Sequence, residues 1–484
     1  MPTTLTARLR IGDRALDHGT GGIYRHRNPA TGEDQVAVPL GGPAEIDEAV
    51  RAAADAFEAW RRWDPARRRE ALLRLSMLIA DHEREFIEIA ALENGTPVRS
   101  GSRLGEIARD WIGYYAGWAD KIDGSVSRSF LSGGEFTYAQ PEPYGVIGVI
   151  ITWNVPLISL AMKAVPALAA GNTIVIKPSE FTPFTPDLFT RLCHEAGIPH
   201  GVVNCVPGSA EAGARLVEHP VVQKITFTGG PATARAILAA CAAALKPAVM
   251  ELGGKSASIV FADADLDVAA QNTVYLGLGA LSGQGCLIGS RVLVHRSVHD
   301  ALLAKLVGAA QQLTIGDPRD PATRFGPVIS AAASDRILGV VERAAAAGGT
   351  IVLGGTKLGG ELAAGNYVAP TIVTDVAPDA EIAQTELFGP VLAVIAFDDE
   401  EEAVRIANGT RFGLAAYVHS RDVTRVLHLV DRLEAGSVYV NGARTVPAHT
   451  PFGGRGDSGF GREGGRQGID EFIRPKTVSI SPLS

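Results

Sequence analysis

Short runs of β-branched residues alternate with helical stretches through the middle of this chain, and that alternation constrains the fold more than any other feature. Five strands are predicted, at Val146–Ile151, Thr173–Lys177, Val202–Val206, Lys224–Thr228 and Ala248–Leu252. Each of the first four strands is followed by a helical pattern. Successive βαβ units of this kind form a parallel sheet with helices on both faces. Nucleotides bind at the carboxyl ends of such strands. We therefore predict an α/β fold with a nucleotide site at this sheet edge.

Helical and strand patterns continue on both sides of this region. One apolar helix face is predicted from five residues at steps of four and three: Ile46, Val50, Ala53, Phe57 and Trp60. A second helix is expected over Ala66–His82. A second α/β series follows from about Ser256, with strands near Arg291–His295, Gly349–Leu353 and Leu392–Ala396.

Composition excludes several classes of protein. A length of 484 residues predicts about three domains. The net charge of −8 and pI near 5.8 disfavour nucleic acid or an anionic membrane as partner. The start of the chain lacks the apolar segment of a signal peptide, and polar residues interrupt the longest apolar stretch, residues 146–176. Four cysteines without CxxC spacing favour a reducing, cytoplasmic location, and no metal site is expected.

Cys286 is the strongest candidate for a reactive residue. It lies in the glycine-rich run Ser282–Arg291, which leaves the thiol little covered, and Glu251 opens the run Glu-Leu-Gly-Gly-Lys-Ser upstream. Cysteine is a nucleophile, and a nearby carboxylate can act as its base. An isolated cysteine is more often a small buried hydrophobe. The other three lie in apolar patterns and are predicted to be inert: Cys193, Cys205 and Cys241.

With these two residues, five further motifs resemble the aldehyde dehydrogenase superfamily, in the order of that family. They are Ile151–Pro156, Ile176–Glu180, Phe227–Gly230, Glu386–Pro390 and Pro451–Gly454, and the resemblance extends from about Asn28 to Val478. It implies that Cys286 attacks an aldehyde to give a thiohemiacetal. Asn154 and the backbone N–H of Cys286 would stabilise the oxyanion, although an asparagine before a proline can also simply turn the chain. Glu251 would activate water, which favours hydrolysis to a free acid over transfer to coenzyme A.

The resemblance also assigns cofactor-binding residues. Lys177 and Glu180 match positions that hold the adenine ribose, and the helix after Gly229 and Gly230 would meet the pyrophosphate. The remaining predicted contacts are Glu386 and Phe388 at the nicotinamide ribose, Trp153 beside the nicotinamide, and Thr152 and Ser179 in the same motifs. A carboxylate at Glu180 favours NAD, with NADP possible. The chain departs from the family at Gly230, Ala234 and Thr152, where serine, glycine and proline are usual.

The substrate is predicted to be an apolar aldehyde. The residues expected at the mouth of the site are Val155, Ile158, Ser159, Met162, Leu287 and Val446. Arg444 could bind a carboxylate there, but we expect it to face solvent, as most arginines do. Two alternatives to an aldehyde-oxidising enzyme are an acyl transferase or thioesterase that uses Cys286, and a non-catalytic relative that keeps the fold.

The resemblance implies three units. A Rossmann-type NAD-binding domain would comprise residues 1–122 and 144–253, and the α/β catalytic domain residues 254–457. A β-hairpin over Ser125–Gln140 and the tail Phe472–Ile480 would form an oligomerisation arm, within 123–143 and 471–484. Because an isolated two-stranded hairpin is marginal in water, we expect a homodimer or a tetramer, with the tail added to a neighbour's sheet edge. A hairpin folded back on its own subunit is the alternative.

Overall fold

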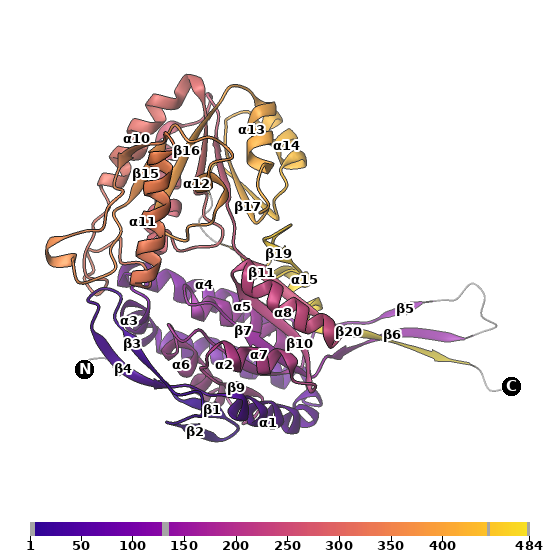
Figure 1. Cartoon of the computed structure of the whole chain (residues 1–484). Coiled ribbons are helices and arrows are strands. Elements are labelled where there is room, and N and C mark those ends of the chain that lie inside the picture. Colours follow the sequence, from indigo (N-terminus) through magenta and orange to yellow (C-terminus); the bar gives the residue numbers. More distant parts are fainter. Residues whose placement is uncertain (1–4, 128–134, 443–445, 482–484) are drawn as a thin grey trace.

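The computed structural model describes residues 5–127, 135–442 and 446–481 of the chain. Two α/β bodies stack on one another, and a thin arm of strands projects from the lower one (Figure 1). Within the described residues no helix is both long and apolar enough to span a bilayer. The centre of the predicted hairpin, residues 128–134, and Arg444 lie outside the described residues.

The first body is built on an eight-stranded sheet with the order β19-β11-β10-β7-β8-β9-β1-β2. Its five central strands are mutually parallel: β7 (Val146–Ile150), β8 (Thr173–Lys177), β9 (Val203–Cys205), β10 (Val222–Gly229) and β11 (Ala248–Leu252). The edge strands are antiparallel: β19 (Gly459–Phe460), β1 (Leu9–Ile11) and β2 (Arg14–Leu16). Strands β7 and β8 are buried at every residue, as expected for a parallel sheet covered on both faces.

Helices cover the two faces of this sheet because successive strand side chains point to opposite sides. Ile147 and Val149 of β7 pack on one face, where the helices are α2 (Pro65–Asp81), α3 (Glu83–Glu93), α4 (Val98–Ala116), α5 (Pro156–Ala169) and α6 (Phe184–Glu195). Val146 and Ile150 pack on the other, with α1 (Pro43–Arg61), α7 (Ala210–Glu218) and α8 (Pro231–Ala243). The predicted apolar face of α1 is confirmed, except that Phe57 is only half-buried.

The second body is built on a seven-stranded sheet with the order β14-β15-β16-β13-β12-β17-β18. All strands except β14 run parallel to their neighbours, and they are β12 (Ala257–Val260), β13 (Arg291–His295), β14 (Thr350–Leu353), β15 (Thr371–Thr374), β16 (Val391–Phe397), β17 (Ala415–His419) and β18 (Ser437–Val440). One face is covered by α9 (Leu266–Val274) and α10 (His299–Gln311). The other is covered by α11 (Ala331–Ala346), α12 (Glu381–Gln384), α13 (Glu400–Asn408) and α14 (Val423–Arg432).

The arm is a three-stranded sheet that extends away from the first body (Figure 1). It contains β5 (Ser125–Ser127), β6 (Phe136–Pro143) and β20 (Ile473–Ile480), with β6 in the centre, and α15 (Gly465–Asp470) precedes β20. β20 pairs with β6 of its own chain along its whole length. Because β20 lies at the edge of the arm sheet, its addition to a neighbouring subunit's sheet stays a prediction.

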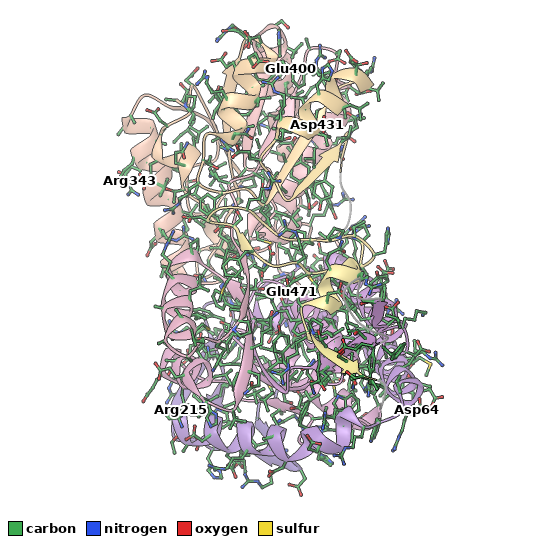
Figure 2. All side chains as sticks on the ribbon, turned by 90° about the vertical axis from the view of Figure 1, so that its right-hand side faces the viewer. Asp64, Arg215, Arg343, Glu400, Asp431 and Glu471 are labelled. Atoms are coloured by element: carbon green, nitrogen blue, oxygen red, sulfur yellow. The ribbon has the colours of Figure 1, made fainter. Side chains whose placement is uncertain are left out.

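Charged side chains lie on the outside of both bodies, as Figure 2 shows for Arg215, Arg343 and Glu400. Many of the exposed arginines are ion-paired. The Arg215 guanidinium contacts the Asp47 carboxylate at 2.5 Å, and that of Arg343 contacts Glu381 at 2.8 Å.

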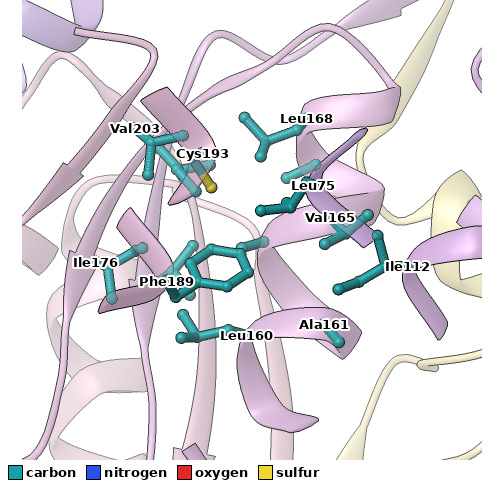
Figure 3. Close-up of a cluster of buried hydrophobic side chains, with 14 of the residues drawn as sticks. Leu75, Ile112, Leu160, Ala161, Val165, Leu168, Ile176, Phe189, Cys193 and Val203 are labelled. Carbon is teal, nitrogen blue, oxygen red and sulfur yellow. The ribbon is translucent and has the colours of Figure 1, made fainter. Parts of the chain in front are cut away.

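The core beside β8 joins helices from distant parts of the sequence (Figure 3). Leu160 of α5 and Phe189 of α6 are fully buried there, with Leu75 of α2 and Ile112 of α4. Apolar burial of this kind contributes about 25 cal/mol per Å² removed from water. The N-terminal helices and the βαβ region therefore share one core.

We predict that Leu160→Ala destabilises the first body by about 2–5 kcal/mol, because it leaves a cavity in a fully packed core. The matched control is Leu427→Ala in α14, where the leucine is exposed and the change should stay within about 0.5 kcal/mol. Urea unfolding followed by tryptophan fluorescence measures both. Equal shifts of the two midpoints would contradict this assignment of the core.

Candidate active site

The predicted site residues gather where the carboxyl edge of the first sheet faces the second body. Thr152, Trp153 and Asn154 follow β7, and Lys177 ends β8 with Ser179 and Glu180 after it. Gly229 ends β10, and Glu251 lies in β11 directly beside Thr228. Because these strands are parallel neighbours, their ends fall on one edge of the sheet.

Cys286 follows a segment with strained backbone, and side-chain hydrogen bonds hold this segment in place. The chain leaves α9 through a π-helical turn over Tyr275–Gly279, and Leu281 and Ser282 then adopt φ of 51° and 53°. Non-glycine residues in this left-handed region cluster at functional sites. The Ser282 hydroxyl donates to the Gly326 carbonyl at 2.8 Å, and the Gly326 N–H donates back at 3.0 Å.

Asn154 and Gln284 join the two bodies beside Cys286. The Asn154 amide nitrogen donates to the Gln284 carbonyl at 2.9 Å. Asn94 holds the same loop, since its amide donates to the carbonyls of Trp153 at 3.1 Å and Asn154 at 3.2 Å. The amide of asparagine carries two N–H groups, so Asn154 keeps one for a substrate oxygen. The alternative role of Asn154 as a simple turn residue does not account for this contact.

A cavity of about 770 Å³ reaches Cys286 and Asn154, within the usual size range of ligand pockets. Five of the residues predicted at its mouth do line it: Val155, Ile158, Met162, Leu287 and Val446. The prediction of Ser159 is not supported, since it is buried within α5 and is not among the lining residues. One step along a helix turns the side chain by about 100°, which takes Ser159 off the face shared by Ile158 and Met162.

The electrostatics around Cys286 disfavour the thiolate. Burial raises the pKa of the Cys286 thiol well above its ordinary value, and the carboxylates of Glu251, Glu386 and Glu463 raise it further. The thiol is half-buried by surface exposure. It is therefore protonated at neutral pH unless a base or a positive charge is brought to it.

Glu251 is buried with one carboxyl oxygen, Oε1, that has no hydrogen-bond partner among the described residues. Burial raises its pKa well above the usual value, and Glu463 adds to the shift while Lys163 opposes it. Lys163 forms an ion pair with Glu463 and donates to the Thr226 hydroxyl at 3.2 Å. A carboxyl in this setting holds a proton more tightly and, once ionised, is a stronger base.

Glu386 and Phe388 belong to the second body and contact the edge of the first sheet at which the cofactor is predicted to bind. The Gly254 N–H donates to the Glu386 carboxylate at 3.0 Å, and a Cβ on Gly253 would lie 1.9 Å from that carboxylate. Burial raises the pKa of Glu386 to about 7. Phe388 has a φ of 51°, and its ring meets the Trp153 ring edge-on at 5.2 Å between centroids.

The two residues predicted to contact the adenine ribose, Lys177 and Glu180, also lie close together. The Lys177 ammonium lies 4.0 Å from the Glu180 carboxylate, and burial lowers the pKa of Lys177. Gly230 is the N-cap of α8, and a Cβ there would meet nothing within 4 Å. The first N–H groups of a helix attract phosphate, and the departure at Gly230 leaves open space in front of them.

A profile of the aldehyde dehydrogenase family matches residues 17–478. The chain belongs to the aldehyde dehydrogenase family. The predicted family and α/β fold are thereby confirmed, and with them an enzyme that oxidises aldehydes.

Solved structures of aldehyde dehydrogenases superpose on almost the whole chain. A Burkholderia cenocepacia protein assigned to this family is 38% identical with a TM-score of 0.96, covering 99% of this chain and 98% of that one. PnpE from Pseudomonas sp. WBC-3 is 36% identical with a TM-score of 0.96, covering 99% of each chain. Betaine aldehyde dehydrogenase from Staphylococcus aureus, in complex with NAD⁺, is 31% identical with a TM-score of 0.96, covering 99% and 95%. PnpE has also been crystallised with the dinucleotide.

Several residues of this aldehyde dehydrogenase were not predicted from its sequence. Gln284 braces the Cys286 loop, because its side-chain carbonyl accepts from the Ile329 N–H at 2.8 Å. Lys163 and Glu463 flank Glu251, and burial lowers the pKa of Lys255 to about 7. A lone lysine within an apolar helix such as α5 is the one signal that could have indicated Lys163. Within the described ranges, no group of three or more His, Cys, Asp or Glu is placed to hold a metal ion.

We expect the alkylation rate of Cys286 by iodoacetamide to rise about tenfold per pH unit from neutral to alkaline pH, because its raised pKa keeps the thiolate a minor species. Mass spectrometry of the Cys286 peptide measures it, and Cys193 and Cys205, both fully buried, serve as internal controls. At alkaline pH, where Glu251 is ionised, Glu251→Gln removes a negative charge near the thiolate and should speed the reaction. A plateau already near neutral pH would contradict the raised pKa.

Proposed function

We propose that this enzyme oxidises an aldehyde to a carboxylic acid through a covalent thioester on Cys286. The observation that carries the proposal is that Cys286 and Asn154 both line the large cavity, while the Glu251 carboxylate lies close enough to Cys286 to raise the pKa of its thiol. One aldehyde, one NAD⁺ and one water give one carboxylic acid, one NADH and one proton. A thiol alone would also suit an acyl transferase or thioesterase. The buried, strongly basic Glu251 favours water as the acyl acceptor.

In the first half of the reaction, the Cys286 thiolate attacks the aldehyde carbon and the carbonyl oxygen becomes an oxyanion. The free N–H of the Asn154 amide and the backbone N–H of Cys286 donate to that oxygen. Such donors, fixed in advance in a dry site, are each worth about 100–1,000-fold in turnover. The thiol proton must leave toward a base, and Glu251 is the nearest carboxylate of high pKa.

The bound dinucleotide supplies an acceptor for the hydride that leaves the thiohemiacetal carbon. The residues that would hold it are Lys177 and Glu180 at the adenine ribose, Gly229 and Gly230 at the pyrophosphate, and Trp153, Glu386 and Phe388 at the nicotinamide end, with Thr152 and Ser179 beside them. The Glu180 carboxylate would accept from a ribose 2′-hydroxyl and repel a 2′-phosphate. NAD is therefore the preferred cofactor, and NADP a possible second one.

Between the two halves, Glu251 releases the thiol proton to solvent, which is the one proton that the overall reaction yields. In the second half, Glu251 removes a proton from water as that water attacks the thioester. The Cys286 sulfur leaves as a thiolate, and the acid is released. Glu463 and Lys163 share the buried environment of Glu251 and oppose one another in their effect on its pKa, so their ion pair sets how readily Glu251 gives up the proton it has gained.

We further propose that each part of the chain has the function predicted for it from the sequence. Residues 1–122 and 144–253 would bind the dinucleotide, residues 254–457 would carry Cys286, and residues 123–143 and 471–484 would form the arm. All four cysteines are free, which supports a reducing, cytoplasmic location. Three large apolar side chains on the arm are exposed, Val126, Phe136 and Ile480, which supports a homodimer or a dimer of dimers that covers them.

We predict that Glu251→Gln slows hydrolysis of the thioester more than hydride transfer, by about 100–10,000-fold, the usual worth of a general base. Rapid mixing with aldehyde and NAD⁺ should then show a burst of NADH near one per active site, followed by a slow steady rate. Cys286→Ala is the control, and it should show no burst while still binding NAD⁺. If Glu251→Gln slows both phases equally without a burst, Glu251 is not the base for water.

We expect Val126→Asp to split the assembly into smaller species, because a charge on the arm cannot be buried against a partner. The matched control is Val423→Asp in α14, since both valines are 69% exposed and only the first lies on the arm. Light scattering at micromolar concentration measures the molar mass of each. Full-length protein that is a stable monomer, or equal behaviour of the two variants, would disprove the proposed role of the arm.

A further inference from the structure

Three arginines line the outer part of the cavity that leads to Cys286. Arg99 and Arg103 belong to α4, and Arg324 belongs to the segment before α11. Arg99 and Arg324 are exposed and Arg103 is half-buried, whereas Asn154 is buried. The arginines therefore mark the end of the cavity that opens to solvent.

Tight packing between the two bodies brings these arginines together. The Val98 N–H, at the start of α4, donates to the Pro318 carbonyl at 2.8 Å. Gly326 lies against Gly95, where a Cβ would come within 2.3 Å of the Gly95 carbonyl oxygen. Arg324 lies between these two contacts in the sequence. The fold thus fixes the positive charge of the second body beside the N-terminal end of α4.

The placement of Arg99 opposes the electrostatics of its own helix. It lies in the first turn of α4, which contains no acidic residue. The first turns of α2 and α14 also lack an acidic residue and contain an arginine, Arg67 and Arg425. The N-terminus of a helix carries partial positive charge and disfavours a cation, so the end of α4 does not neutralise Arg99.

The cavity wall offers Arg99 and Arg324 no acidic counter-charge. Its lining residues, all of them described, contain no Asp, Glu or Lys, although the whole chain has a net charge of −8. Among the described residues no ion pair involves Arg99 or Arg324, in contrast to Arg215 and Arg343 (Figure 2). The mouth of the cavity is therefore positive, and it opens from an otherwise acidic protein.

The same helix face turns from charged to apolar toward its C-terminal end. Arg99, Arg103, Ile107 and Trp111 recur at every fourth residue of α4 and all line the cavity, over about 18 Å of helix axis. Residues i and i+4 of a helix share one face. The remaining apolar lining includes Met162. A ligand that fits this wall has an apolar body and a negative group at its outer end.

We propose that the preferred substrate is an oxo-acid, an aldehyde whose far end carries a carboxylate on an apolar chain or ring. The inference rests on the proposed oxidation at Cys286 and adds to it the group that the cavity mouth recognises. The planar guanidinium of arginine binds a carboxylate through two parallel hydrogen bonds. The carboxylate lies far from the reacting carbon, so its binding energy is the same in the ground state and the transition state. It should therefore lower KM and leave kcat little changed.

The test compares an ω-oxo fatty acid with its methyl ester, which has almost the same shape and no charge. NADH absorbance gives kcat/KM for both, and we expect the acid to be preferred about tenfold, the combined effect of several exposed charge pairs. In Arg99→Gln/Arg324→Gln the ratio of acid to ester should fall toward one, mainly through KM. The ratio should also fall with added salt, which screens exposed charges.

Arg319→Gln is the matched control. Arg319 lies in the same segment as Arg324 but pairs with Asp317 and does not line the cavity, so its loss should preserve the preference for the acid. The inference is overturned if the wild-type enzyme oxidises acid and ester equally, or if the double variant leaves their ratio unchanged. In both cases, turnover of the ester still upholds the proposed function.

If neither compound is oxidised, the proposed function fails, and calorimetric binding of acid and ester to Cys286→Ala still decides the inference. Tighter binding of the acid, lost in the double arginine variant, supports it. Equal binding of acid and ester overturns it.

Discussion

The hydrogen bond from the Asn154 amide to the Gln284 carbonyl is the interaction on which the rest of the site depends. It ties the loop that follows the first parallel strand to the loop that carries Cys286, and these loops come from different bodies. Gln284 is held in turn by the chain near Ile329, and Asn154 by Asn94. Because such a contact is buried, its geometry is well defined and its loss would leave polar groups without partners. The proposed nucleophile, Cys286, and the proposed oxyanion donor, Asn154, are thereby held in position by the protein itself.

The low dielectric around this contact explains the unusual acid–base state of the site. Burial and three carboxylates act on Cys286 in the same direction, and burial also raises the pKa of Glu251 and Glu386. A thiol that keeps its proton is a poor nucleophile, so Cys286 is unreactive in this environment. It becomes reactive when a positive charge enters or a base loses its proton, so reactivity is tied to occupancy.

Much of this could be predicted from sequence because parallel strands buried on both faces give continuous apolar runs. Thr173–Lys177 and Ala248–Leu252 were predicted to the residue, and the motif residues at their ends do share one sheet edge. Predictions failed where long-range packing decides. Ser159 lies one residue along α5 from the cavity face, so it is turned away from the cavity. Nothing near Gln284 or Glu463 in the sequence indicates their distant partners.

Residues 459–480 contribute contacts to the first sheet, to the surroundings of Glu251 and to the arm. Gly459 pairs with Glu251, Glu463 with Lys163, and the Phe472 carbonyl accepts from Asn172 before β20 completes the arm. A nascent chain folds from its N-terminus as it is synthesised, so neither the surroundings of Glu251 nor the arm can form until residues 459–480 have been made. A chain terminated before these residues would thus lack both the contacts around Glu251 and the strand that completes the arm.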